Sequence, residues 1–354
     1  MKKLLMTVLI MGTAITLPAQ ENKWFENVMI GGFGIVQYQA SDQDGNEKNS
    51  FDLRMARVAL EGRSFNDFYW KAQMQVSGTT KDDNTAIRLI DLFVEWKKYK
   101  VAKVKVGQFK RPFTFENPIN PVAQGFMSSS QGISKLAGSN DRTGEQASNG
   151  RDIGFQLQGD LLSNAKNYAL LSYQIGVFNG QGINTKDVDQ RKDIIGGLWV
   201  SPVKGVRIGI FGWTGSRGIE ESDANGDKHV SSLSKNRYAL SGEYAAKGWV
   251  VRSEYIHSQG FGKNRNLGDK ADAYYAQVIV PIGDKWRLKA RYDVYREEKK
   301  WSTSKTFYEI GADYHFTKKL RMNLEYARVN DRSISSGVSQ HNYNLVDAQL
   351  DILF

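Results

Sequence analysis

Basic residues at alternate positions are the feature of this sequence that could carry chemistry. They are separated by apolar residues, and in an extended chain such positions share one face, so each run presents a row of cations. Arginine matches two oxygens of a phosphate group, and rows of arginine and lysine attract anions. The residues with this pattern are Lys103, Lys105, Arg252, Arg287, Lys289, Arg291 and Arg321.

Residue patterns that would support catalysis or metal binding are missing. The four histidines are scattered, and neither a His-Glu-x-x-His motif, a Gly-x-Ser-x-Gly elbow nor a phosphate-binding Walker loop occurs. The chain has no Cys, which removes thiol catalysis and disulfides. The stretch from Asp223 to Asp227 resembles the start of a calcium loop, but Ser234 stands where the closing Glu belongs. We therefore expect no enzyme, metal site or cofactor.

The composition favours a protein built from strands. The chain has 354 residues, a net charge of +10 and a mean hydropathy of −0.49, which is too polar for a helical membrane protein. Aromatic residues make up 12%, whereas disordered chains are poor in them.

The N-terminus has the organisation of a secretory signal peptide. Lys2 and Lys3 precede an apolar run over 4–15, and small residues follow around Ala19. The apolar run is too short to cross a bilayer as a helix, and a buried N-terminal helix is the less favoured alternative. We expect a signal peptide over 1–20, cleaved near residues 19–20, and one mature domain over 21–354.

The rest of the chain alternates with a period of two, which indicates strands. Sixteen segments show it: 27–40, 51–62, 67–77, 85–97, 101–109, 151–160, 167–178, 190–200, 205–214, 236–245, 249–258, 271–281, 285–296, 305–315, 319–329 and 342–354. Short and long connections alternate between them, which is the plan of an outer-membrane barrel. A soluble all-β protein is the alternative, but these segments are longer than soluble strands usually are. The sequence thus predicts an all-β fold, a 16-stranded antiparallel transmembrane β-barrel.

Aromatic residues near the segment ends support a membrane setting, because amphipathic rings favour the membrane interface. The tryptophans that we place in these girdles include Trp96, Trp199, Trp213, Trp249 and Trp286.

The strand cations must face the lumen, since a charge on the lipid side costs about 2–4 kcal/mol near the midplane. The lumen is then lined with arginine and lysine, which favours anions. Acidic residues such as Glu243, Asp293 and Glu325 alternate inward as well, so a mixed, weakly selective wall stays open.

The connection over 110–150 is too long for an idle hairpin loop. Folded inward as the third loop of the barrel, it would narrow the pore; the alternative is a surface loop without a special role. The basic residues that we assign to this constriction are Lys110, Arg111, Lys135, Arg142 and Arg151.

Several motifs resemble the phosphate-selective porin O/P family. They are the run Gly107-Gln-Phe-Lys-Arg-Pro-Phe113 with Glu116-Asn-Pro118, the run over 51–57 leading to Glu61-Gly62, and Arg151-Asp-Ile-Gly-Phe155. The resemblance covers essentially the whole mature chain. It implies a usually trimeric outer-membrane porin of sixteen strands, in which an inward third loop and a ladder of basic residues conduct anions such as phosphate or pyrophosphate.

Two functions stay open at this stage. The first is a passive, anion-preferring channel in the outer membrane of a Gram-negative bacterium, with small anions, outer-membrane lipid, lipopolysaccharide and two further copies of the chain as partners, and no nucleic acid. The second is a structural or partner-binding surface barrel without selective transport. Conductance across a planar bilayer distinguishes them.

Overall fold

The structure is a computed structural model that describes residues 26–45, 48–77, 87–144, 149–163, 168–223, 225–261, 269–333 and 342–354. The expected signal peptide lies outside the described residues.

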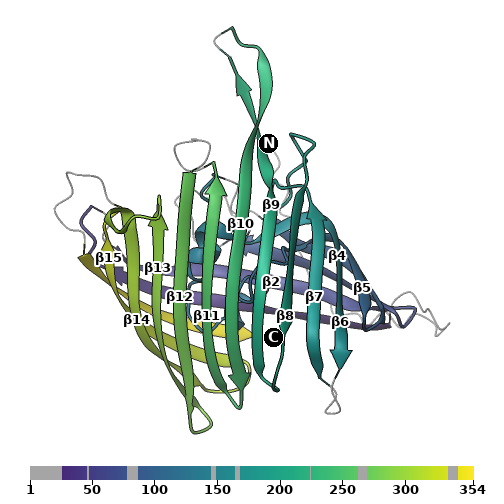
Figure 1. Cartoon of the computed structure of the whole chain (residues 1–354). Coiled ribbons are helices and arrows are strands. Elements are labelled where there is room, and N and C mark those ends of the chain that lie inside the picture. Colours follow the sequence, from purple (N-terminus) through teal and green to yellow (C-terminus); the bar gives the residue numbers. More distant parts are fainter. Residues whose placement is uncertain are drawn as a thin grey trace, which may run out of the picture.

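The described strands form one closed antiparallel barrel, in which β1 pairs with β16 (Figure 1). The sixteen-stranded antiparallel β-barrel predicted from the sequence is therefore confirmed. The first eight strands are β1 (Glu26–Ser41), β2 (Lys48–Ser64), β3 (Phe68–Ser77), β4 (Ile87–Tyr99), β5 (Ala102–Lys110), β6 (Arg151–Ser163), β7 (Ala169–Phe178) and β8 (Asp193–Val200). The second eight are β9 (Val206–Ser222), β10 (Lys228–Ala246), β11 (Trp249–Gly260), β12 (Asp269–Ile282), β13 (Trp286–Glu297), β14 (Ser304–His315), β15 (Leu320–Asp331) and β16 (Asn342–Leu353).

The strands alternate between an apolar outer face and a polar inner face. On β14 and β15, Ile310 and Leu324 are exposed on the outside, while Asp313 and Asn323 are buried on the inside. Outward apolar residues suit lipid, and the buried polar residues find partners on neighbouring strands. The hydropathy of the whole chain is low because it averages these two surfaces.

The two ends of the barrel differ in their connections. At one end the turns contain two to five residues, whereas the other end carries the longer loops. The predicted strands 205–214 and 236–245 imply a loop over 215–235. This expectation is wrong in part, because β9 extends to Ser222 and β10 begins at Lys228, and the two strands pair over these residues. This hairpin rises above the other loops (Figure 1). The residues that extend the two strands are mostly polar. The alternating pattern of a membrane strand therefore ends before the backbone hydrogen bonds between β9 and β10 do.

Aromatic rings mark the short-turn end on the outside of the barrel. Tyr314 packs against Trp286 and Phe316, with ring centroids 4.7 and 4.9 Å apart. The girdle prediction is wrong for Trp199 and Trp213, which point inward and pack on Phe211 or Phe113. Period-two alternation places a residue on one face or the other, but a tryptophan is compatible with both.

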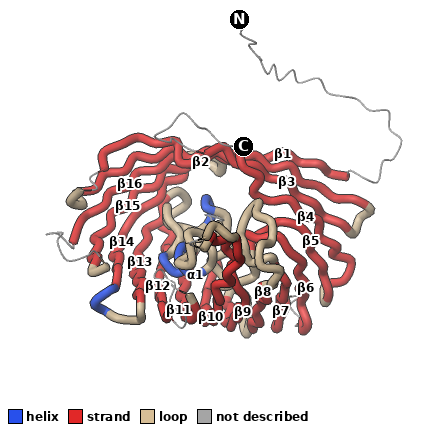
Figure 2. The backbone as a smooth tube through the Cα atoms, turned by 90° about the horizontal axis from the view of Figure 1, so that it is seen from above, coloured by secondary structure: helices blue, strands red, loops and turns tan. Residues whose placement is uncertain are grey.

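The described part of the connection between β5 and β6, residues 111–144 and 149–150, is named the inner loop below and lies inside the ring of strands (Figure 2). It contains the short helices η1 (Pro121–Ala123) and α1 (Gln131–Leu136), and α1 lies beside β11, β12 and β13. The Ser130 hydroxyl caps α1 by accepting from the Ile133 amide at 3.3 Å. A further short helix, η2 (Trp301–Thr303), lies between β13 and β14. Within the described ranges, no helix has the length and apolar character needed to cross a membrane.

Candidate functional site

The inner loop is closed at its base, where it leaves β5 and returns to β6. The Arg111 amide donates to the Gly150 carbonyl at 2.9 Å. The Asn117 amide group donates to the carbonyls of Arg111 and Gly150, at 2.9 and 3.2 Å. Gly150 has φ +72°, and a Cβ there would lie 1.9 Å from Asn117 Oδ1, so only glycine fits. These hydrogen bonds direct the chain from the wall into the lumen.

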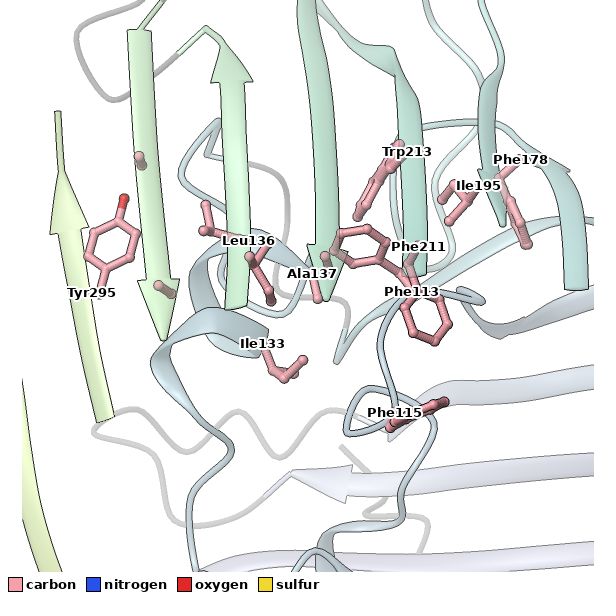
Figure 3. Close-up of a cluster of buried hydrophobic side chains, with 14 of the residues drawn as sticks. Phe113, Phe115, Ile133, Leu136, Ala137, Phe178, Ile195, Phe211, Trp213 and Tyr295 are labelled. Carbon is pink, nitrogen blue, oxygen red and sulfur yellow. The ribbon is translucent and has the colours of Figure 1, made fainter. Parts of the chain in front are cut away.

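Aromatic residues fix the first part of the inner loop to the wall. Phe113 packs edge-on against Trp213, with ring centroids 5.5 Å apart, and Phe115 packs edge-on against Phe211 at 5.3 Å (Figure 3). All four rings are almost fully buried. This contact accounts for the inward direction of Trp213, which serves as a platform for the inner loop.

Carboxylates of the wall accept hydrogen bonds from backbone amides of the inner loop. Glu254 on β11 accepts from the amides of Phe115 and Glu116, at 2.6 and 3.2 Å. Further along, Asp293 accepts from Gln131 at 2.8 Å and Glu325 accepts from Met127 at 2.9 Å. Irregular backbone has amides without a ladder partner, and these acids satisfy them.

Three of the predicted pathway cations also hold the inner loop, because they donate hydrogen bonds to its backbone carbonyls. Lys289 donates to Gly125 at 2.9 Å, Arg291 to Ser128 at 2.8 Å and Arg321 to Val122 at 2.8 Å. Each also pairs with a wall carboxylate. The pairs are Lys289 with Asp313 and Glu325, Arg291 with Glu309, and Arg321 with Asp351.

The other predicted pathway cations also lie on the inner face, and most of them are paired. Arg252 contacts Glu243 at 2.6 Å, Arg287 contacts Asp313 at 2.5 Å and Lys103 contacts Asp160 at 3.2 Å. Lys105 differs, because its ammonium group lies over the rings of Phe93 and Phe109, at 4.9 and 5.3 Å. The ladder expected from sequence is thus, for the most part, a set of ion pairs.

The five predicted constriction residues occupy different surroundings. Lys110 donates to the carbonyls of Asn117 and Ile119, at 2.6 and 2.8 Å. Arg111 is fully buried against Asp152, at 2.8 Å. Lys135, on α1, is exposed. Arg142 pairs with Glu297 of β13, and Arg151 with Asp91 of β4 at 2.6 Å. Lys110, Arg111 and Arg151 are brought together, whereas Lys135 and Arg142 lie elsewhere in the inner loop.

A basic hollow of about 280 Å³ lies in the lumen between the base of the inner loop and the wall formed by β3 to β7. Five cations and one carboxylate, Asp91, line it together with three aromatic rings and four glutamines. The cations are Lys71, Lys105, Lys110, Arg111 and Arg151. Glu61 and Asp152, just outside this lining, pair with Lys71 and Arg111, at 3.5 and 2.8 Å. The cations still outnumber these carboxylates, so this part of the lumen carries net positive charge and is suited to a small anion.

Two arginines of β2, Arg54 and Arg57, also face the lumen and were not among the predicted site residues. Arg54 donates to Gln349 at 2.7 Å, and Arg57 donates to Gln75 at 2.8 Å. They are three positions apart, so in a regular strand they would face opposite sides. The register of β1 against β2 shifts between Ile35 and Val36, and the resulting bulge brings both arginines inside. Only the pairing partners reveal the bulge.

Asp141 anchors the second half of the inner loop. Its carboxylate accepts two hydrogen bonds from Arg237 of β10, at 2.5 and 2.8 Å, and both side chains are fully buried. Burial opposes the ionisation of Asp141, but the charge and hydrogen bonds of Arg237 outweigh it, so the pKa of Asp141 is lowered. The carboxylate therefore stays charged in neutral and mildly acidic solution.

Together the closed barrel, the apolar outer face and the anchored inner loop define a transmembrane β-barrel of the channel class. The Gram-negative porin family matches residues 6–333, and the chain belongs to this family. It is therefore an outer-membrane porin. The described residues contain no cluster of three side chains of the metal-binding kind.

Solved porins have the same fold. The anion-selective porin from Comamonas acidovorans is 11% identical, with a TM-score of 0.66 over 92% of this chain and 99% of that chain. OmpF of Salmonella typhi in complex with daunomycin is 13% identical, with a TM-score of 0.64 over 92% and 97%. OmpT of Vibrio cholerae in its trimer form is 13% identical, with a TM-score of 0.60 over 92% and 99%. No curated protein sequence matches the chain.

Proposed function

We propose that this porin is a passive diffusion channel that prefers small anions of the phosphate or pyrophosphate type. The observation that carries the proposal is the basic hollow, where the five cations of the lining outnumber the carboxylates that they contact. In the ion pairs elsewhere on the wall, the positive and negative charges largely cancel. The preference therefore depends on the basic hollow rather than on the whole predicted ladder.

In this proposal, the residues divide into two roles. Lys71 and Lys105 attract the anion, since both residues are half-buried rather than enclosed; Lys71 also pairs with Glu61 at 3.5 Å. Lys110 adds positive charge but is held by carbonyls of the inner loop, whereas Arg111 and Arg151 are paired with Asp152 and Asp91. Binding has to remain weak, because a channel conducts only if the solute also leaves. The chain performs no catalysis in this scheme.

The test is conductance of the purified barrel in a planar bilayer under a KCl gradient. We expect stepwise conductance with a reversal potential directed toward chloride. We also expect added phosphate to reduce the chloride current. The double variant Lys71→Gln with Lys105→Gln should weaken both the preference for chloride and the reduction of the current by phosphate. Lys299→Gln combined with Lys300→Gln removes the same charge from an exposed loop and serves as the control. Absence of conductance, or a potassium-directed potential, contradicts the proposal.

We extend the proposal to the assembly and its surroundings. A homotrimer is supported by the trimer form of the Vibrio cholerae relative, and outer-membrane lipid and lipopolysaccharide would surround it. Light scattering of the detergent-solubilised protein tests the assembly. A monomer mass under conditions that preserve the folded barrel contradicts it.

A further inference from the structure

The short-turn end of the barrel has an unbalanced charge. The described turns carry six exposed lysines against two aspartates, Asp67 and Asp284. In barrels of this class the short turns face the periplasm. None of the six lies within ion-pair distance of a carboxylate of the described chain. The lysines are Lys100, Lys204, Lys247, Lys285, Lys318 and Lys319.

Three of these lysines surround one hollow at the rim. Lys247, Lys285 and Lys318 come from the successive turns β10–β11, β12–β13 and β14–β15, and the hollow between them measures about 560 Å³. Arg287 and His315 line its inner side, and Asp284 is the carboxylate in its lining. Because Arg287 is already paired with Asp313, the lysines supply the unpaired charge.

The outer side of the same hollow is aromatic. Trp286 and Phe316 line it, and both rings are exposed on the lipid side of the barrel. Tyr314 contacts both rings, at 4.7 and 4.9 Å. Such rings lie at the level of lipid headgroups. The hollow therefore combines a cationic rim with an aromatic edge at the depth of the membrane interface.

We propose that this rim hollow binds the headgroup of an anionic phospholipid in the periplasmic leaflet of the outer membrane. The phosphate would lie among Lys247, Lys285 and Lys318, while the acyl chains would descend past Trp286 along the apolar face. A zwitterionic lipid carries its own positive group and would be held less well. The aromatic edge favours a lipid over a purely polar polyanion such as the peptidoglycan layer.

Native mass spectrometry of the full barrel, released from micelles with equal amounts of phosphatidylglycerol and phosphatidylcholine, tests the proposal. We expect the wild type to retain phosphatidylglycerol preferentially. In the triple variant Lys247→Gln, Lys285→Gln and Lys318→Gln, this retention falls at least about tenfold, since each lysine near an anionic surface strengthens attraction by about fivefold. Gel mobility before and after heating confirms that the variant is folded.

The matched control removes three exposed lysines from the opposite end, Lys228, Lys270 and Lys299. If both triple variants lose phosphatidylglycerol equally, net charge rather than the rim hollow is responsible, and the proposal is overturned. Sedimentation with purified peptidoglycan sacculi tests whether the rim hollow binds peptidoglycan instead of lipid. Loss of sacculus binding with unchanged lipid retention also overturns the proposal. Channel selectivity is independent of this site, so either proposal can fail alone.

Discussion

Arg237 and Asp141 form a fully buried, two-point ion pair between the barrel wall and the inner loop, with contacts of 2.5 and 2.8 Å. The same guanidinium donates to the Leu136 carbonyl at 2.9 Å and lies over the ring of Trp213 at 4.6 Å. One wall residue therefore holds helix α1, the chain after it and the aromatic platform together. This contact is therefore one of the anchors that hold the inner loop in the lumen.

Arg237→Leu should loosen the inner loop. The change leaves the Asp141 carboxylate buried without a partner, which costs about 3–5 kcal/mol of folding stability. We expect a lower urea midpoint on gel-mobility assays and noisier single-channel currents. The double variant with Asp141→Leu should recover part of the stability, because no charge is then left unpaired. An unchanged midpoint in the single variant contradicts the anchoring role, and Lys300→Leu, in an exposed pair, controls for charge.

The stabilising effect of Asp141 should depend on pH in a defined direction. Its pKa is lowered from the ordinary value of 3.8, so its contribution is complete above that value and is lost as the pH falls through the lower pKa of the folded state. We expect the stability difference between wild type and Asp141→Asn to be constant from about pH 7 to pH 5 and to shrink below about pH 4. Urea titrations at each pH measure it. A difference that already shrinks near pH 6 disagrees with the assignment.

Selectivity should respond to the basic hollow and not to the ion pairs of the opposite wall. A unit charge about 8 Å from an ion in water changes its energy by about 0.5 kcal/mol, with opposite sign for chloride and potassium. Lys105→Gln should therefore lower the chloride-to-potassium permeability ratio about fivefold. The double variant Arg291→Gln with Glu309→Gln removes a pair without changing net charge. Its reversal potential should equal that of the wild type. If the pair variant shifts more than Lys105→Gln does, the predicted ladder rather than the basic hollow sets selectivity.

Gly107 should be sensitive to any side chain. It has φ +130°, and a Cβ there would lie 2.2 Å from the Leu92 carbonyl of the neighbouring strand. Gly107→Ala should therefore destabilise the barrel by about 1–3 kcal/mol, because neither backbone can move freely. Gly34→Ala is the matched control, since nothing lies within 4 Å of a Cβ at that position. Equal urea midpoints for the two variants would refute the steric explanation.

Much of the architecture could be predicted because its causes are local. The inward or outward direction of a side chain follows from its place in a two-residue repeat, and lipid on one side enforces that repeat over sixteen strands. The alternation of short and long connections also predicted the order of the strands, in which consecutive strands are neighbours. These rules failed at the bulge in β2, which brings Arg54 and Arg57 to the same side, and in places where lipid does not act. The β9–β10 hairpin extends as a polar ladder, and Trp213 faces the lumen because the inner loop packs on it.

The candidate site was predictable in its residue types but not in its electrostatics. From sequence, Lys105 and Arg291 look alike, because both alternate with apolar residues. The structure places Glu309 beside Arg291 and aromatic rings beside Lys105. Which neighbour a cation meets depends on the register between strands and on the path of the inner loop, and both are set by the closed barrel. The sequence by itself therefore determined that this lumen is rich in cations, and only the tertiary structure decided which of them meet a carboxylate.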